Sequence, residues 1–146
     1  MCFQDGGAGN DTLNWIVRGV NSANAQCSLY GGAGNDVFNG ELGTFENELT
    51  ITTGTVSFLL DAGTGNDHFN LTANLSAASD ATISSVAVLL GAGNDTATLN
   101  LLSLGGAVIL DQVYDGGRAH DTYEGNVPAM FLPRANFEIF LPLVDS

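Results

Sequence analysis

Short stretches in which apolar and polar residues alternate flank five glycine-rich segments of the chain. Residues 13–15 read Leu-Asn-Trp and residues 69–71 read Phe-Asn-Leu, each just after such a segment, and residues 27–29 read Cys-Ser-Leu just before one. A period of two predicts a β-strand with one buried face, and the 3.6-residue period of a helix is absent. The predicted unit is therefore a strand, a glycine turn and a second strand.

The glycine-rich segments are five copies of one hexapeptide. It reads GGAGND at residues 6–11 and 31–36, AGTGND at 62–67, LGAGND at 90–95 and GGRAHD at 116–121. The closing aspartates are 25, 31, 28 and 26 residues apart, a spacing typical of stacked repeats. We therefore expect an all-β fold, a parallel β-solenoid of about five coils of 25–31 residues, with the Gly-Asn-Asp turns stacked along one edge.

A coil of this length has room for a third short strand. The candidates are residues 49–52, 81–84 and 107–110. Stacking also brings residues of equal phase above one another, about 4.8 Å apart. Asn14, Asn39 and Asn70 share the position three residues after the closing aspartate. We expect their amides to hydrogen-bond along the solenoid axis, which is a structural role rather than a ligand role.

Composition and charge narrow the partners. The chain is 45% apolar and 13% charged, which suits one domain with a core. It has 16 Asp and Glu against three Arg and no Lys, for a net charge of −13. This balance argues against nucleic acid and anionic membranes, which require Lys and Arg, and it favours cations. The sequence has no membrane-spanning apolar run and no N-terminal signal-peptide pattern.

The turns also suggest a family. Residues 5–13 (DGGAGNDTL) and 31–39 (GGAGNDVFN) resemble the RTX, or haemolysin-type, nonapeptide GGxGxDxUx, a β-helix repeat that binds Ca²⁺. RTX nonapeptides follow one another directly and place turns on both sides of a β-roll, whereas 16 to 22 other residues intervene here. The resemblance therefore implies a variant with a single stack of calcium turns along one edge.

Calcium chemistry is consistent with this resemblance. Stacked aspartates repel one another unless a cation lies between them, and Ca²⁺ takes roughly six to eight carboxylate and carbonyl oxygens. By similarity to the family, each ion is shared by two successive turns. Five turns leave four gaps, and the fifth turn departs from the motif at Arg118, Ala119 and His120, so we expect about three or four Ca²⁺ ions. The candidate metal ligands are Gly6, Gly7, Ala8, Gly9, Asp11, Gly31, Gly32, Ala33, Gly34, Asp36, Ala62, Gly63, Thr64, Gly65, Asp67, Leu90, Gly91, Ala92, Gly93, Asp95 and Asp121.

The aspartates, cysteines and histidines of the chain also have interpretations that involve no calcium. The aspartates can serve as plain turn residues that accept Asx-type hydrogen bonds from local amides without any ion. Turn chemistry alone does not require Asp in all five copies, so calcium is favoured. Cys2 and Cys27 occupy the same phase in neighbouring coils, as core neighbours or as a disulfide. His68 and His120 do not converge with each other or with a nucleophile, so we do not expect an enzyme.

The last residues break the repeat. We expect a calcium-binding solenoid over residues 1–125 and a C-terminal cap or tail over 126–146, since solenoid ends need cover. The RTX resemblance offers a second interpretation of this tail, as part of a type I secretion signal.

The expected function is that of a calcium-binding structural or adhesive module, secreted or on a bacterial cell surface. Its partners would be calcium and cell-surface or matrix components, and the chain would be part of a longer one or self-stacking. One alternative is a calcium-dependent polysaccharide-binding or accessory module of a secreted enzyme. Another is an ice-binding solenoid, by similarity to RTX-like solenoids that present an outward Thr and Asn on each calcium turn. The Asn is present in four turns (Asn10, Asn35, Asn66 and Asn94), but the Thr position has only Thr64, with Ala8, Ala33 and Ala92 in the other turns.

Overall fold

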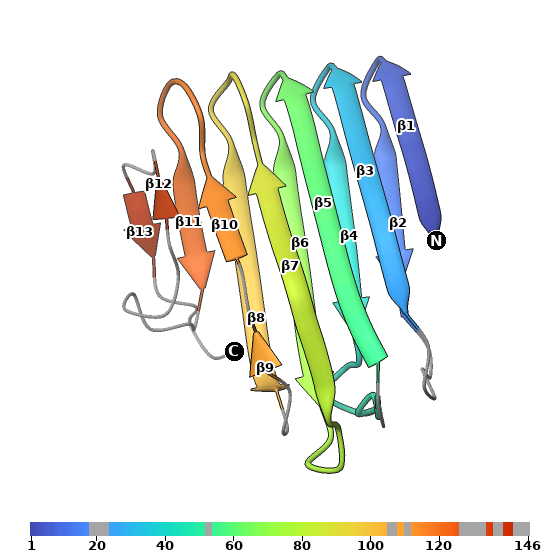
Figure 1. Ribbon diagram of the computed structural model, residues 1–146. Coiled ribbons are helices and arrows are strands. Elements are labelled where there is room, and N and C mark those ends of the chain that lie inside the picture. The colour runs from blue at the N-terminus through green and yellow to red at the C-terminus, as the bar shows by residue number, and fades with distance from the viewer. Residues whose placement is uncertain are drawn as a thin grey trace.

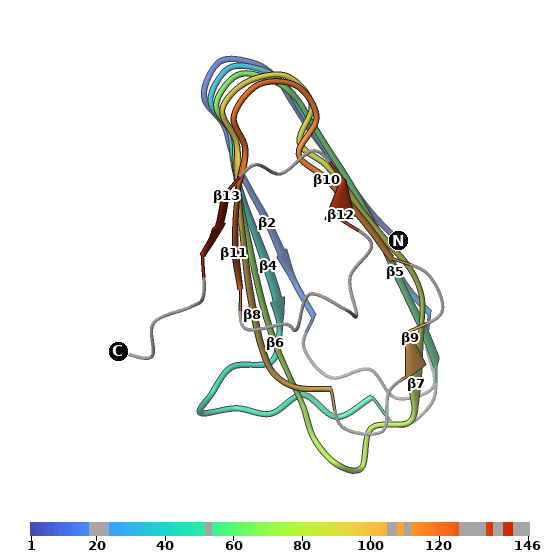
Figure 2. The same cartoon turned by 90° about the vertical axis from the view of Figure 1, so that its left-hand side faces the viewer.

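The structure is a computed structural model that describes residues 1–17, 24–51, 54–104, 108–109, 112–125, 134–135 and 139–141. Two parallel β-sheets face each other. Figure 2, which looks along the stacking direction, shows the glycine-rich turns overlapping at one edge of the solenoid. The first sheet contains β1 (Cys2–Ala8), β3 (Ala25–Ala33), β5 (Gly54–Thr64), β7 (Ala81–Leu89), β10 (Gln112–Asp115) and β12 (Arg134–Ala135), with β9 (Val108–Ile109) beside β7.

The second sheet continues each coil after its turn. In stacking order it contains β2 (Thr12–Ile16), β4 (Val37–Leu42), β6 (His68–Leu75), β8 (Thr96–Leu104), β11 (Thr122–Gly125) and β13 (Ile139–Leu141). Successive coils climb along one axis in Figure 1, and every strand pair in both sheets is parallel. The described residues contain no helix. The predicted fold class, a parallel β-solenoid, is confirmed.

The register keeps the motif in phase although the coils differ in length. Gly7 pairs with Gly32, which pairs with Gly63, and after the turn Phe38 pairs with Leu13 and with Phe69. Most extra residues of the longer coils lie at the edge of the solenoid opposite the turns, in the segments between β4 and β5 and between β6 and β7, and one more is inserted where the β5–β7 register shifts after Val56. The turns therefore stack without insertions between them.

The core lies between the sheets. Leu29, Leu60 and Val88 form one fully buried row on the first sheet, and Phe38 and Phe69 belong to the facing row on the second. These are the positions that the alternation pattern assigns to the buried face. Stacking each apolar side chain on its equivalent in the next coil gives the narrow solenoid a continuous interior.

The third strand is only partly as expected. Val108 and Ile109 form the separate strand β9, whereas residues 81–84 are the beginning of the longer strand β7. Thr82 and Ile83 pair with Thr55 and Val56 in β5, so the ladder runs on with a single register shift after Val56. Residues 49–52 do not form a strand in the described part: Leu49 makes one isolated bridge to Leu75, and position 52 lies outside the described residues.

The expected asparagine ladder is confirmed on the outer face of the second sheet. The Asn39 Nδ2 donates to Asn14 Oδ1 at 3.0 Å, and the Asn70 Nδ2 donates to Asn39 Oδ1 at 3.1 Å. Each amide therefore links one coil to the next, because parallel in-register strands place identical side chains side by side.

The described residues of the C-terminal stretch extend the stack. Tyr114 pairs with Arg134 and Thr122 pairs with Ile139, so β12 and β13 continue the two sheets past the fifth turn. The rest of residues 126–146 lies outside the described residues. The domain boundary after residue 125 stays a prediction.

Candidate functional site

The turn backbone explains why glycine recurs at its second and fourth positions. Gly32 has φ +99° and Gly34 has φ +139°, a region that L-residues rarely adopt. A Cβ on Gly34 would also collide with the carbonyl oxygen of Gly9 in the preceding coil, and a Cβ on Gly32 would collide with that of Gly7. Glycine therefore allows neighbouring turns to approach as closely as neighbouring strands do.

The fifth turn breaks this rule. Ala119 takes the fourth position with φ +101°, the only positive φ of a non-glycine among the described residues. The turn still pairs with the fourth, because the Gly93 N–H donates to the Arg118 carbonyl at 3.1 Å and the Arg118 N–H donates to the Gly91 carbonyl at 2.8 Å. The departure from the motif is thus accommodated in a strained turn.

A column of exposed motif asparagines ties each turn to the next one. The Oδ1 of Asn10 accepts the backbone N–H of Asn35, and the Oδ1 of Asn35 accepts that of Asn66, both at 2.8 Å. Asn94 and His120 continue the column through their backbone N–H groups, at 2.9 and 3.2 Å. The column was not predicted from the sequence, although the same Asn in four successive turns was its signal.

A second column, of aspartates, ties each turn to the preceding one. The Asp36 Oδ1 accepts the backbone N–H of Asp11 at 2.8 Å, and the same bond joins each later aspartate to its predecessor, at 2.8, 2.7 and 2.9 Å. Asp36, Asp67, Asp95 and Asp121 are all at most 2% exposed. Part of the plain-turn interpretation is therefore correct, with the difference that the amides belong to the neighbouring coil.

The second carboxylate oxygen of these residues has no such bond. The Oδ2 atoms of Asp11, Asp36, Asp67 and Asp95 are buried without a hydrogen-bond partner. A buried carboxylate with an unpartnered oxygen is costly unless a cation or a proton neutralises it.

Burial of these carboxyls also shifts the pKa values of two of the stacked aspartates. Burial raises the pKa of Asp67 to about 6, and the charge of Asp36 adds to the rise, while the backbone hydrogen bond with Asp36 lowers it. The pKa of Asp95 is raised to about 7, chiefly by burial. The hydrogen bond from the Asp67 backbone N–H lowers this pKa, and the charges of Asp67 and Asp121 raise it. The interior of the turn stack therefore resists negative charge in the absence of a cation.

In the first two turns this oxygen faces a space beside the first glycine. A Cβ built on Gly6 would lie 2.9 Å from the Asp11 Oδ2 and 2.9 Å from the Gly31 carbonyl oxygen. A Cβ on Gly31 would collide with the Asp36 Oδ2 and with the Ala62 carbonyl oxygen. In each case a carboxylate oxygen and a carbonyl oxygen of the next coil converge on the same space. Hard oxygen donors of these two kinds suit Ca²⁺.

The predicted ligand residues thus lie together in the turn stack, but the stacked aspartates do not converge on a common point as the side chains of a metal cluster do. Among the described residues, no three His, Cys, Asp or Glu side chains gather into a metal-binding group. Most ligands of any bound ion would have to be backbone carbonyls. His68 lies half-buried on β6 and His120 is exposed in the fifth turn, so the histidines do not add to the stack's interior.

The cysteines form a disulfide. Cys2 and Cys27 are register partners on β1 and β3, their Cα atoms are 4.4 Å apart, and the structure joins their sulfurs. Of the two arrangements that the sequence left open, the bridged one is present. It ties the first coil to the second.

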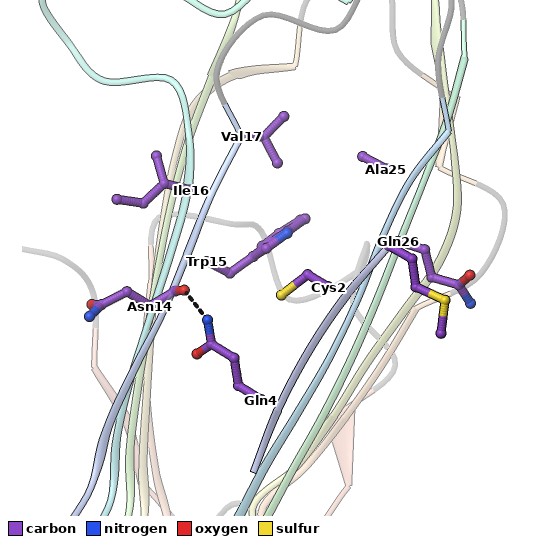
Figure 3. Close-up of a pocket in the computed structure, with 9 residues that line it drawn as sticks. Cys2, Gln4, Asn14, Trp15, Ile16, Val17, Ala25 and Gln26 are labelled. Carbon is purple, nitrogen blue, oxygen red and sulfur yellow. Dashed lines mark hydrogen bonds between the residues drawn. The ribbon is translucent and has the colours of Figure 1, made fainter. Parts of the chain in front are cut away.

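Two hollows lie in the surface outside the turn stack. One of about 420 Å³ opens between β1 and β2 at the end of the stack, where Gln4 donates to the Asn14 carbonyl at 3.0 Å (Figure 3). Gln4 stands at a position that Leu29 and Leu60 fill in later coils, and the described residues that line the hollow include no acidic or basic side chain. The other, of about 280 Å³, is lined by Asn14, Ile16, Asn39, Gly40, Glu41, Thr44, Asn70 and Thr72.

No helix in the described part of the chain is long and apolar enough to cross a membrane. Comparison of the chain with protein-family models, with curated proteins and with solved structures gave no match.

Proposed function

We propose that the chain is a calcium-stabilised structural or adhesive module that works outside the cell. The observation that carries the proposal is that the buried Oδ2 atoms of four stacked aspartates, Asp11, Asp36, Asp67 and Asp95, have no hydrogen-bond partner. A divalent cation would satisfy these oxygens and remove the repulsion between successive carboxylates. The resemblance of the turns to the RTX nonapeptide supports the same ion.

In this proposal the ligand oxygens come from the protein's own carboxylates and backbone carbonyls. The Asp11 and Asp36 carboxylates and the carbonyls of Gly31 and Ala62 would hold the ions of the first two turns. Bound Ca²⁺ would supply positive charge at the points where negative charge is buried. The role is structural and binding rather than enzymatic.

The proposed location follows from affinity and from the disulfide. Extracellular Ca²⁺ sites have dissociation constants of about 10⁻⁴ to 10⁻³ M, so they fill where calcium is millimolar. A site whose dissociation constant is tenfold below free calcium adds about 1.4 kcal/mol to stability, which makes folding dependent on location. The Cys2–Cys27 disulfide suits an oxidising compartment. We therefore propose secretion or display on a bacterial surface.

The test measures folding and ion binding together. Calcium-depleted protein is followed by circular dichroism while CaCl₂ or MgCl₂ is added to millimolar concentration. We expect Ca²⁺ to raise β-structure and melting temperature, and Mg²⁺ to act weakly because it keeps its water and demands octahedral geometry. Equal stabilisation by both ions would indicate charge screening and contradict the proposal.

A matched pair of variants separates ion binding from hydrogen bonding. Asp36→Asn keeps an oxygen that accepts the Asp11 N–H but loses the charge, so the calcium response should fall. Asp61→Asn removes the same charge from an exposed position on β5 and should leave the response unchanged. If Asp36→Asn keeps the full calcium response, the aspartates act only as turn caps.

A second candidate function, polysaccharide binding, is favoured by the hollow on the outer face of the second sheet. Its lining of amides, hydroxyls and the Glu41 carboxylate offers hydrogen-bonding groups, and Ile16 offers an apolar surface. Binding of neutral polysaccharides in calcium-containing buffer, measured by pull-down and compared with Asn39→Ala, tests this candidate. Equal retention of both proteins would argue against it.

A further inference from the structure

The first residue of the turn hexapeptide is its most variable position inside the solenoid. It is glycine in the first, second and fifth turns, Ala62 in the third and Leu90 in the fourth. Ala62 and Leu90 are both fully buried. Their side chains therefore face the interior, on the side of the chain where the buried aspartate of the same turn also lies.

The glycine turns show what a side chain at this position displaces. At Gly6, a Cβ would approach the Asp11 Oδ2 and the Gly31 carbonyl oxygen to 2.9 Å, and at Gly31 the equivalent contacts are closer still. The space beside the first glycine is thus bounded by one carboxylate oxygen, one carbonyl oxygen and a carbon atom, which is the Asp11 Cβ at Gly6 and the Phe38 Cζ at Gly31. In the third turn a methyl group occupies the equivalent direction, and in the fourth turn an isobutyl group does so.

Apolar carbon and a cation compete for such a space. Ca²⁺ needs its oxygens at about 2.3 to 2.6 Å with nothing else between them. A buried leucine fills an interior space with close-packed carbon and excludes water as well as ions. The five turns are therefore unequal, although each ends in aspartate.

We propose that the first residue of the hexapeptide decides whether a turn binds calcium, so that the first two turns bind it most tightly, Ala62 weakens the third site and Leu90 closes the fourth. The inference rests on the proposed function and sharpens it. It moves the weak point of the ion column from the altered fifth turn to the fourth. The coils around Leu90 are then held together by apolar packing in place of an ion.

The test is a gain of binding. Leu90→Gly and Leu90→Ala both remove the leucine from the core, and only Leu90→Gly also removes the Cβ. Calcium stoichiometry is measured by isothermal titration and native mass spectrometry on the full chain, with circular dichroism as the control for folding. We expect Leu90→Gly to bind one ion more than the parent, and Leu90→Ala to bind an additional ion only as weakly as the third turn, which also has alanine at this position.

Two further variants keep the test decisive if Leu90→Gly does not fold. Ala62→Gly removes a single methyl group and should tighten calcium binding about tenfold at one site. Gly6→Ala should weaken calcium binding at one site, since its new Cβ lies against the Asp11 Oδ2 and the Gly31 carbonyl.

The outcomes distinguish the two proposals. A parent protein that binds calcium, with binding unchanged by Ala62→Gly and Gly6→Ala, would overturn this inference alone. A parent that binds no calcium at millimolar concentration would overturn the proposed function and this inference with it.

Discussion

Without calcium, the protein should lose stability as the pH rises from about 4 to about 7. Burial raises the pKa of Asp67 to about 6 and that of Asp95 to about 7, from a usual value of 3.8. A carboxyl whose folded-state pKa lies above its unfolded value binds more protons in the folded state. Its contribution is fully present below the unfolded pKa and is lost as the pH rises through the folded pKa.

The magnitude follows from the size of the shifts. One pKa unit corresponds to about 1.4 kcal/mol, so ionising Asp67 and Asp95 costs about 3 and about 4 kcal/mol. The two costs are coupled, because the charge of Asp67 itself raises the pKa of Asp95, and their joint effect is not their sum. A loss of this size is comparable with the whole stability of a typical domain, about 5 to 15 kcal/mol.

Calcium should reverse the loss. An ion that binds the ionised carboxylates takes the place of the protons, so calcium should stabilise the protein strongly at pH 8 and weakly at pH 5. The assay is urea unfolding followed by circular dichroism at both pH values, in calcium-depleted buffer and in millimolar CaCl₂. Asp95→Asn should flatten the calcium-free pH profile, because its amide does not titrate.

The absence of this pH dependence would refute the reasoning. If the calcium-free protein is as stable at pH 8 as at pH 5, the buried carboxylates do not bear the cost that their burial implies. If calcium stabilises equally at both pH values, its site does not include them.

The remaining predictions concern the stacking of the coils. Gly34→Ala should destabilise the protein in chemical unfolding by about 1 to 3 kcal/mol more than Gly9→Ala, because both positions require a positive φ but only Gly34 meets a preceding carbonyl and so adds an overpacking cost; equal losses would contradict the close approach of the turns. Asn39→Ala removes two ladder hydrogen bonds and should cost about 1 to 2 kcal/mol in urea unfolding; no loss would make the ladder energetically neutral. Replacing Cys2 and Cys27 by Ala opens a loop of 25 residues and should cost about 3 kcal/mol, seen as a lower melting temperature that reducing agent does not lower further; an unchanged melting temperature would contradict this.

The architecture could be predicted because a parallel solenoid converts spacing along the chain into neighbourhood in space. Once the hexapeptides are aligned on their closing aspartates, every residue of equal phase falls on a common row. That is why the core rows around Leu29 and Phe38 and the ladder through Asn39 follow from the sequence alone. The lengths of the strands did not follow, because residues 81–84 favour a strand equally well as a separate element or as the beginning of β7.

The orientation of the turn side chains could not be predicted either. Spacing shows that Asp36 stacks between two other aspartates, but not which neighbour its carboxylate faces. Peptide N–H groups at the turn are within reach of both neighbouring coils, and the structure shows that Asp36 accepts from the coil before it while Asn35 accepts from the coil after it. The local Asx bond expected under the plain-turn interpretation fails for this reason: the carboxylate is used between coils.

The different positions of the adjacent residues Asn35 and Asp36 bear on the calcium proposal. Both side chains accept one backbone N–H through an Oδ1 atom, a task that the neutral amide of asparagine performs as well as a carboxylate. Desolvation alone would place the charged residue outside and the neutral one inside. The chain does the reverse in the second, third and fourth turns, where an exposed asparagine such as Asn35 precedes a buried aspartate such as Asp36. Hydrogen bonding does not explain a charge at the buried position, whereas a cation beside the Asp36 Oδ2 would.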